Sequence, residues 1–396
     1  MESAQKHQLK LLDHIRHANR ANPVSQATET AYLETPRHLF VPRYRRFGSK
    51  TWCDVDADNL SEHLQTIYAD GPLILFGDDD GDITSTISQP SLVLRMLDML
   101  RVEPGQTIFE LGAGSGWSAS LLGRLVGPEG HVYSLEILPE IAQRAAATVQ
   151  ALGVQNVSIV EADGGQGYAA GAPYDRAIFA AGTYDLPQYF YEQVKDGGFL
   201  LVVIKNEGGG DCLFLMKKIN GHFESIESMQ CAFVQMTGRY RMDSLEPICL
   251  ERLPEWRELK SKELARTDFW WGGKGKESFV WRTWGIRSFL GITEPLFQVF
   301  KSEKASTIPY EENYFGLWDR PGESLVIARD DALISYGTPA AKERLMEDIE
   351  KWIYLGMPTS ANFSLQAFPS DERVQAGKNQ WIVKRSESQF LWSLAA

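Results

Sequence analysis

A glycine-rich turn and three acidic side chains in the first half of the chain have the types and the spacing of a nucleoside-binding site. The turn, GAGSG at 112–116, follows a short apolar segment that ends with Glu110. Glycines there let a ligand approach the N–H groups at the start of a helix. Glu136, 20 residues beyond the turn, is placed to accept hydrogen bonds from both hydroxyls of a ribose. Asp163 is placed to reach an adenine amino group, and Glu110 would also suit a cationic ligand.

The turn alone is a weak signal, and its pattern argues against hydride transfer. A dinucleotide-binding turn has the pattern GxGxxG, but Trp117 occupies the position of its last glycine. Each acid taken singly is equally well explained as a helix cap or a solvated strand end. Because the acids follow successive predicted strands of one sheet, we favour a cofactor site over chance placement.

Strands and helices alternate regularly around these residues. The pattern predicts helices at 6–20, 26–35, 90–101, 117–126, 139–152 and 187–194, and strands at 106–111, 131–136, 157–161, 175–180 and 199–204. This order predicts an α/β fold with a parallel, doubly wound sheet and right-handed crossovers. Two further strands, at 212–219 and 223–234, flank the hairpin turn Asn220-Gly221 and are expected to close one edge of the sheet.

Several segments carry a resemblance to a known family. ELGAGSGW at 110–117 resembles the first motif of S-adenosyl-L-methionine-dependent methyltransferases, and residues from about 28 to 238 resemble the protein-L-isoaspartate O-methyltransferase family. The matching segments are TPRHLFVPRYRR (35–46), TISQP (86–90), ELGAGSGWSASLLGRLVGPEGHVYSLEI (110–137), EADG (161–164), YDRAIFAAGT (174–183), KDGGFLLVVI (195–204) and AFVQMTG (232–238). TISQP is the most specific of them, since general methyltransferases lack it. Gln235 departs from the family, which usually has proline there.

The resemblance implies a Rossmann-like, seven-stranded methyltransferase sheet with a C-terminal antiparallel hairpin. It also implies S-adenosyl-L-methionine as the cofactor, S-adenosyl-L-homocysteine as its product, and transfer of the methyl group to a carboxylate. Ser88 would lie beside the transferred methyl group and the acceptor carboxylate. The residues implied for the cofactor are Ile87, Ser88, Gln89, Glu110, Gly112, Gly114, Gly116, Glu136, Ile137, Asp163, Gly164 and Thr237.

The residue types agree with transfer to a carboxylate. The side chain of an aspartate or isoaspartate is ionised at neutral pH, since its ordinary pKa is near ~4, so its methylation needs no general base. The seven histidines show no spacing typical of a metal site, and we expect no metal. Ser88 is interpreted as a hydrogen-bond donor to the acceptor carboxylate. Its alternative role is to cap the helix that begins at Pro90.

Acidic residues are concentrated in one segment of an acidic chain. The net charge is −12, and the segment 51–82 contains nine acids and no Lys or Arg. Such crowding predicts a solvated, extended loop. The alternative is a negatively charged lip that attracts a basic peptide or repels a wrong substrate. The sign of the charge disfavours binding to nucleic acid.

Composition also indicates a location. No apolar run approaches the length of a membrane span, and the N-terminal segment MESAQKHQLK lacks the apolar core of a secretory signal. The four cysteines are far apart and form no CxxC pair, which favours reduced thiols over disulfides or zinc. We therefore expect a cytoplasmic protein without a membrane span. The oligomeric state is unknown from the sequence.

Tryptophan divides the chain near residue 252, since nine of the eleven tryptophans follow residue 250. We expect a methyltransferase domain at 1–252 and an α+β domain at 253–396, with an amphipathic helix at 339–355 and an edge strand at 380–383. Its aromatic residues are explained either as a core or as a peptide-docking surface for substrate recognition. The segment WWGGKGK (270–276) is interpreted as a mobile loop that gates the active site.

A second domain favours a dedicated substrate over general protein repair. The leading hypothesis is methylation of an Asp or isoAsp side chain within a peptide or protein. Relatives with such extensions suggest tailoring of a ribosomally synthesised peptide through a succinimide to isoaspartate. The alternatives are methylation of a peptide C-terminus or a small-molecule acceptor, and a cofactor-binding scaffold without catalysis. The presence of the glycine turn, Glu136, Asp163 and Ser88 argues against the scaffold.

Overall fold

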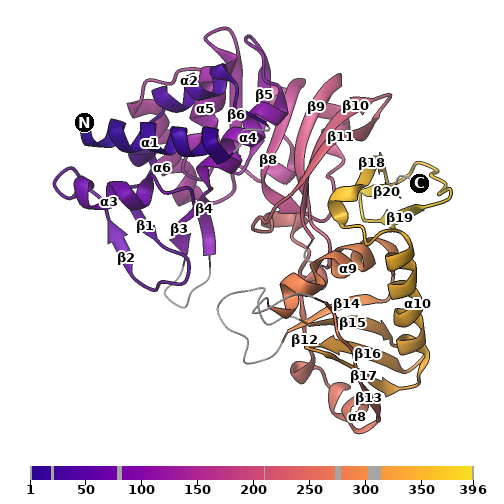
Figure 1. The fold of residues 1–396 in the computed structure, drawn as a ribbon. Coiled ribbons are helices and arrows are strands. Elements are labelled where there is room, and N and C mark those ends of the chain that lie inside the picture. The colour runs from indigo at the N-terminus through magenta and orange to yellow at the C-terminus, as the bar shows by residue number, and fades with distance from the viewer. Residues whose placement is uncertain are drawn as a thin grey trace.

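The computed structural model describes residues 2–18, 22–77, 83–208, 210–272, 278–301 and 314–394. These residues form a ten-stranded central sheet, a four-stranded sheet near the N-terminus and a six-stranded sheet built from the C-terminal part (Figure 1). Three helices that precede the central strands are α1 (Glu2–Ala18), α2 (Gln26–Glu34) and α4 (Pro90–Leu100).

The central sheet contains the predicted methyltransferase fold. Its first seven strands are β5 (Thr107–Leu111), β6 (His131–Glu136), β7 (Val157–Glu161), β8 (Tyr174–Thr183), β9 (Val194–Ile204), β10 (Cys212–Ile219) and β11 (His222–Gln230). They lie in the order β11-β10-β9-β8-β5-β6-β7. β5 to β9 are parallel, and β10 and β11 are antiparallel. The predicted seven-stranded, Rossmann-like sheet is confirmed.

Both faces of the parallel strands are buried, as in a sheet that is covered on both sides. On β5, for example, Ile108 belongs to one apolar core and Phe109 to the other. The first face is covered by α4, α5 (Trp117–Val126) and α6 (Pro139–Ala151), and α2 packs on α4 and α5. The second face is covered by α7 (Tyr189–Gln193) and by residues of the C-terminal part.

The hairpin β10–β11 is confirmed, with Asn220 and Gly221 both at positive φ, but the prediction that it closes an edge of the sheet is wrong. β11 pairs with β18 (Phe363–Pro369), and β20 (Ser388–Leu394) and β19 (Gln380–Lys384) continue the sheet beyond it. β19, predicted as an edge strand, forms that edge. The pattern of one strand shows that it is buried, but not which distant strand lies beside it.

The prediction that the acidic segment is an extended loop is wrong for its described residues. β1 (Arg43–Arg45), β2 (Trp52–Asp54), β3 (Leu73–Gly77) and β4 (Ile83–Ile87) form the four-stranded sheet, and α3 (Leu60–Ile67) lies between β2 and β3 in the sequence. Leu64, Ile67 and Leu73 are buried, whereas Asp54 and Glu62 are exposed. This segment therefore folds around its apolar residues and keeps most of its charges outside. Residues 78–82 lie outside the described part.

The six-stranded sheet has helices on both faces, which confirms the predicted α+β architecture. Its strands are β12 (Ile248–Cys249), β13 (Glu263–Asp268), β14 (Phe297–Lys301), β15 (Tyr314–Asp319), β16 (Ser324–Arg329) and β17 (Ala332–Gly337), in the order β12-β14-β15-β16-β17-β13. α9 (Phe279–Thr293) and α10 (Ala340–Tyr354) pack on one face, and α8 (Trp256–Ser261) packs on the other.

The sheets do not divide at residue 252. β12 precedes that residue and belongs to the six-stranded sheet, whereas β18 to β20 follow it and extend the central sheet. One apolar core runs through both parts, and within it Phe214 packs edge-to-face on Trp392 with ring centroids 5.6 Å apart. α9 also contacts the loop after β9, where Nδ2 of Asn206 donates to the carbonyl oxygen of Ser288 (3.4 Å). The domain boundary at 252/253 stays a prediction.

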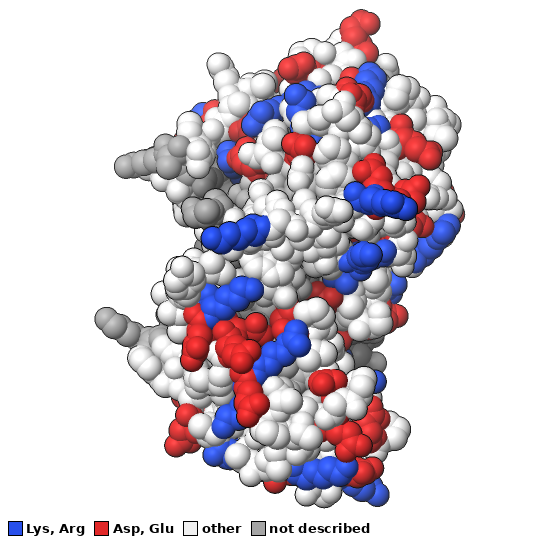
Figure 2. All heavy atoms as spheres, turned by 90° about the vertical axis from the view of Figure 1, so that its right-hand side faces the viewer, with Lys and Arg blue, Asp and Glu red and all other residues white. Residues whose placement is uncertain are grey.

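The aromatic residues of the C-terminal part are mostly core. Trp318 and Trp392 are buried, but Trp270 and Trp281 are 72% and 65% exposed. Residues 273–277 of the expected gating loop lie outside the described part. Figure 2 shows Lys and Arg interspersed with Asp and Glu over the face on the right of Figure 1. Among the described residues, no helix combines the length and apolarity needed to cross a membrane.

Candidate functional site

The glycine turn lies at the carboxyl end of β5, and Glu136 holds it in place. Gly112, Gly114 and Gly116 have φ angles of 89°, 53° and 82°, in the left-handed region that favours glycine. Oε2 of Glu136 accepts from the backbone N–H of Gly114 (3.0 Å), and Oε1 accepts from that of Leu138 (3.2 Å). Because a carboxylate oxygen has two lone pairs, Glu136 can still accept hydrogen bonds from a ligand.

Asp163 occupies the corresponding place after β7, and two backbone segments fix its carboxylate. Oδ1 accepts from the N–H of Gly165 (3.0 Å), and Oδ2 accepts from that of Arg239 (3.1 Å). Arg239 belongs to a distant part of the chain. It reaches Asp163 because the segment before it pairs with the end of β8, where the N–H of Met236 donates to the carbonyl oxygen of Gly182 (2.8 Å).

The turn 237–240 closes tightly over Asp163. A Cβ atom on Gly238, whose φ is 79°, would lie 2.6 Å from Oδ2 of Asp163 and 2.5 Å from Cδ1 of Ile137. A larger residue would therefore displace the carboxylate. Thr237 caps this turn and is exposed. The structure thus brings together Asp163, Ile137 and Thr237, three of the residues expected at the cofactor.

Ser88 directly follows β4, which lies beside the glycine turn. A Cβ atom on Gly114 would lie 3.6 Å from Oγ of Ser85 and 3.7 Å from the carbonyl oxygen of Thr86. Ser88 is half-buried. Its alternative role as a helix cap is wrong, since Gln89 is the N-cap residue of α4. The segment TISQP and the first motif, far apart in the sequence, therefore share one site.

Arg37 is a buried residue next to Ser88 that sequence reasoning missed. Its guanidinium is fully buried and donates to the carbonyl oxygens of Ser88 (3.0 Å), Gly71 (3.0 Å) and Ile67 (2.6 Å). It also lies over the ring of Trp117, and burial lowers its pKa to about 10. Arg37 belongs to the quoted segment 35–46, but nothing in a single sequence distinguishes a buried arginine from an exposed one.

Glu110 lies beneath the turn and is fully buried. The hydroxyl of Ser134 donates to its Oε2 (2.5 Å), and burial raises the pKa of Glu110 to about 7. In the folded chain this carboxyl group is thus partly protonated at neutral pH, and a nearby cation would favour its ionised form.

The raised pKa of Glu110 makes the stability depend on pH. The folded chain binds this proton more tightly than the unfolded chain, so the group's contribution to stability falls as the pH rises from about 4.5 to about 7. We expect Glu110→Gln to gain stability relative to the wild type between pH 4 and pH 8, by on the order of 2–3 kcal/mol. Urea unfolding of both proteins without ligand measures this. The exposed control Glu62→Gln should show no such gain, and a pH-independent difference for Glu110→Gln would contradict the assignment.

Other expected cofactor residues have roles in packing. Gly116 faces α6, where a Cβ atom would lie 3.1 Å from Cγ2 of Val149. Ile87 is buried in the first core. Nε2 of Gln89 donates to Oδ2 of Asp70 (3.1 Å). Gly164 lies against Leu111, with a Cβ position 2.9 Å from its Cγ. That these four residues also line the cofactor stays a prediction.

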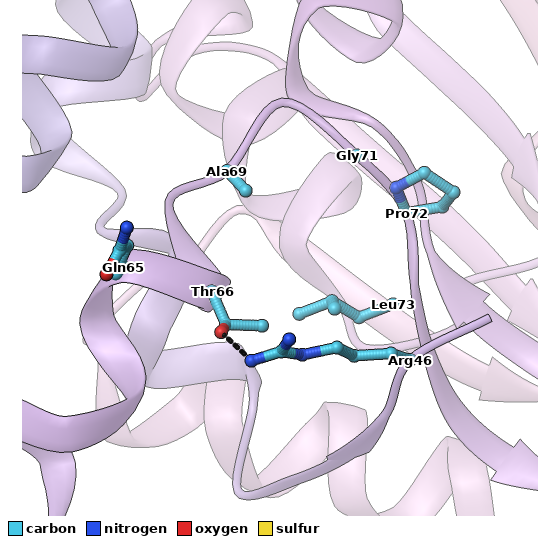
Figure 3. Close-up of a pocket in the computed structure, with 7 residues that line it drawn as sticks. All are labelled: Arg46, Gln65, Thr66, Ala69, Gly71, Pro72 and Leu73. Carbon is cyan, nitrogen blue, oxygen red and sulfur yellow. Dashed lines mark hydrogen bonds between the residues drawn. The ribbon is translucent and has the colours of Figure 1, made fainter. Parts of the chain in front are cut away.

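A cavity of about 460 Å³ adjoins this region in the N-terminal part. Arg46, Thr66 and Leu73 point into it, and Nη2 of Arg46 donates to Oγ1 of Thr66 (2.7 Å) (Figure 3). Gly71 also lines it and is held by Arg37. Arg37 thus links Gly71 in the wall of the cavity to the carbonyl oxygen of Ser88. No cluster of metal ligands occurs among the described residues.

The fold and the site define a class of protein. A parallel sheet with a glycine turn after its first strand, and acids after its second and third, is the arrangement expected of an S-adenosyl-L-methionine-dependent methyltransferase. The sequence profile of the family "Protein-L-isoaspartate(D-aspartate) O-methyltransferase" matches residues 7–241.

Known relatives agree with this match. A protein-L-isoaspartate O-methyltransferase of Ignicoccus hospitalis is 33% identical over 206 residues, which cover 52% of this chain and 86% of the relative. One of Methanothrix thermoacetophila is 33% identical over 220 residues, or 55% and 91% of the two chains. A solved structure titled protein-L-isoaspartate O-methyltransferase has a TM-score of 0.53 at 22% identity and covers 91% of this chain and 96% of its own.

The chain belongs to the protein-L-isoaspartate O-methyltransferase family. It is an S-adenosyl-L-methionine-dependent carboxyl O-methyltransferase, which confirms the family, the enzyme class and the cofactor that the sequence predicted. The similarity in fold to the solved structure extends beyond the profile, into the C-terminal part.

Proposed function

We propose that the enzyme methylates the side-chain carboxylate of an isoAsp or Asp residue within a peptide or protein. The observation that supports this most is that β4, which Ser88 directly follows, lies beside the glycine turn. The Ser88 hydroxyl would then lie next to the expected methyl donor and the acceptor carboxylate.

The residues of the site suit the cofactor. Glu136 keeps lone pairs that suit the two ribose hydroxyls, and Asp163 keeps lone pairs that suit the adenine amino group. Gly112, Gly114 and Thr237 would line the remaining cofactor surface. Glu110, buried below the turn, would favour a positively charged ligand. When bound, S-adenosyl-L-methionine supplies a methyl group on a sulfonium centre.

The chain's own residues would orient the acceptor rather than activate it. An isoAsp or Asp carboxylate is already ionised at neutral pH, so no base has to remove a proton. The Ser88 hydroxyl would donate a hydrogen bond to one carboxylate oxygen and leave the other oxygen aligned with the methyl group. Arg37 would keep Ser88 in place by donating a hydrogen bond to the carbonyl oxygen of Ser88. Orientation of this kind supplies a large part of the rate enhancement in reactions between two bound partners.

Ser88→Ala should therefore slow methyl transfer and leave cofactor binding intact. Loss of one hydrogen bond to a charged group predicts a decrease in kcat of about 10- to 100-fold. The Kd for S-adenosyl-L-homocysteine, measured by calorimetry, should change by less than about two-fold. If Ser88→Ala lost binding and rate together, Ser88 would have a structural role instead.

Three matched peptides test the acceptor. They contain isoAsp, Asp or Ala at one central position and have amidated C-termini, and deuterated-methyl cofactor allows mass spectrometry to locate the product. We expect a methyl ester at the central residue of the isoAsp or Asp peptide and none on the Ala peptide. Labelling of all three would exclude the side-chain carboxylate. Adding an Ala peptide with a free C-terminus tests the alternative acceptor, the terminal carboxylate.

Tailoring of a ribosomally synthesised peptide in the cytoplasm remains our proposal for the biological role, with a small-molecule acceptor as the alternative. The C-terminal part is weak support for it, because a solved structure with the name of the general enzyme covers 91% of this chain. A stronger test is the product: tailoring predicts conversion of one particular Asp in a precursor peptide to isoaspartate, whereas repair predicts consumption of isoAsp in many sequences.

A further inference from the structure

We infer that Glu387, in the turn between β19 and β20, is a positioning residue for the cofactor site and holds the turn 237–240 over Asp163. This inference rests on the proposed contact between Asp163 and the adenine. Glu387 lies 146 residues beyond the last residue that the family profile matches. The C-terminal part would thus complete a site that the methyltransferase sheet does not complete alone.

Three donors converge on the Glu387 carboxylate. Oε2 accepts from the hydroxyl of Tyr240 (2.9 Å) and from the N–H of Gln188 (3.0 Å). Oε1 accepts from Nη2 of Arg239 (3.3 Å), and the Glu387 side chain is 15% exposed. Hydrogen bonds to an ionised acceptor are stronger than those between neutral groups. Glu387 therefore links Gln188, in the loop after β8, to both Arg239 and Tyr240.

The same two residues determine how Asp163 is held. The N–H of Arg239 donates to Oδ2 of Asp163. The ring of Tyr240 packs on Gly165, where a Cβ atom would lie 2.4 Å from its Cδ2, and Gly165 donates to Oδ1. Tyr240 is 6% exposed. Each oxygen of Asp163 is thus fixed by a residue that Glu387 holds directly or through the Tyr240 ring.

The turn that contains Glu387 is itself fixed at the carboxyl edge of the central sheet. The N–H of Glu387 donates to Oδ2 of Asp185 (2.9 Å), and the hydroxyl of Ser388 donates to Oδ1 of the same residue. Nη2 of Arg385 forms an ion pair with Glu207 (2.9 Å). Asp185 follows β8 and Glu207 follows β9, so the turn bridges two loops at the edge where Glu136 and Asp163 lie.

Removing the carboxylate should loosen cofactor binding without affecting the chemistry. In the full chain we expect Glu387→Gln to raise the Kd for S-adenosyl-L-homocysteine, and the KM for the cofactor, by about ten-fold. The kcat and the KM for the isoAsp peptide should stay within two-fold of the wild type. Tyr240→Phe, which keeps the ring on Gly165 and removes the donor, should have a similar effect.

The double variant distinguishes one shared contact from two separate defects. Since both changes weaken the same contact between Glu387 and Tyr240, Glu387→Gln with Tyr240→Phe should weaken binding by less than the sum of the two single effects. The control is Glu372→Gln, an exposed carboxylate in the loop before β19, which should leave the Kd unchanged.

The outcomes separate this inference from the proposed function. If the wild type failed to bind S-adenosyl-L-homocysteine, the proposed cofactor site itself would be contradicted. If the wild type bound it and Asp163→Asn weakened it, but neither Glu387→Gln nor Tyr240→Phe did, only the positioning role would be overturned. Fully additive losses of cofactor binding in the double variant would also overturn it. So would losses of kcat and thermal stability as large as the loss of binding.

Discussion

Glu136→Ala should raise the Kd for S-adenosyl-L-homocysteine by at least about 100-fold. The carboxylate is expected to accept hydrogen bonds from two ribose hydroxyls, and two bonds to a charged acceptor contribute about 3 kcal/mol or more. It also holds the N–H groups of Gly114 and Leu138. Its loss therefore removes a ligand contact and loosens the turn. Isothermal calorimetry on the full chain measures the change.

Two comparisons make this result specific. Glu136→Gln keeps one acceptor oxygen and should fall between the wild type and Glu136→Ala. Glu129 is exposed and lies just before the amino end of β6, whereas Glu136 lies at its carboxyl end. Glu129→Ala should therefore leave binding unchanged. If Glu136→Ala bound the ligand as tightly as the wild type, Glu136 would be only a support of the turn.

Arg37→Leu should cost on the order of 3–5 kcal/mol of folding free energy and nearly abolish methyl transfer. The buried guanidinium donates to five carbonyl oxygens of the segments 67–71 and 87–88. Leucine would remove the shared donor of these acceptors and leave the buried ones short of a hydrogen bond, which is among the more destabilising kinds of substitution. Urea unfolding gives the free energy, and transfer to the isoAsp peptide gives the rate.

The position of Ser88 explains why the rate should fall with the stability. Its carbonyl oxygen is one of the five acceptors, so the segment TISQP loses its anchor even in molecules that remain folded. Arg124→Leu replaces a more exposed arginine of α5 and should change stability by less than about 0.5 kcal/mol. If Arg37→Leu matched that control, the buried network would be unimportant for the fold.

The parts of the site that depend on local pattern were predictable. A glycine turn after an apolar strand, and acids at the ends of the next two strands, follow from the order of strands in a parallel sheet. Glu136 and Asp163 accordingly lie where the sequence placed them. The resemblance to a family motif predicts Ser88 at the site, and β4, which it follows, lies beside the turn.

The parts that depend on distant pairing were not predictable. β18 joins β11 across more than 130 residues, and Glu387 reaches Tyr240 across 147. No periodicity in either segment identifies its partner. The acidic segment is a different case. Its charge predicts a solvated loop, whereas the spacing of Leu64, Ile67 and Leu73, which are buried, determines how it folds.

One measurement tests the central claim most directly: a crystal structure of the full chain with S-adenosyl-L-homocysteine and an isoAsp peptide. We expect the ribose at Glu136, the adenine at Asp163, and the isoAsp carboxylate within hydrogen-bond distance of the Ser88 hydroxyl and facing the sulfur atom. A nucleoside bound away from the glycine turn, or a peptide whose carboxylate cannot reach Ser88, would contradict the account.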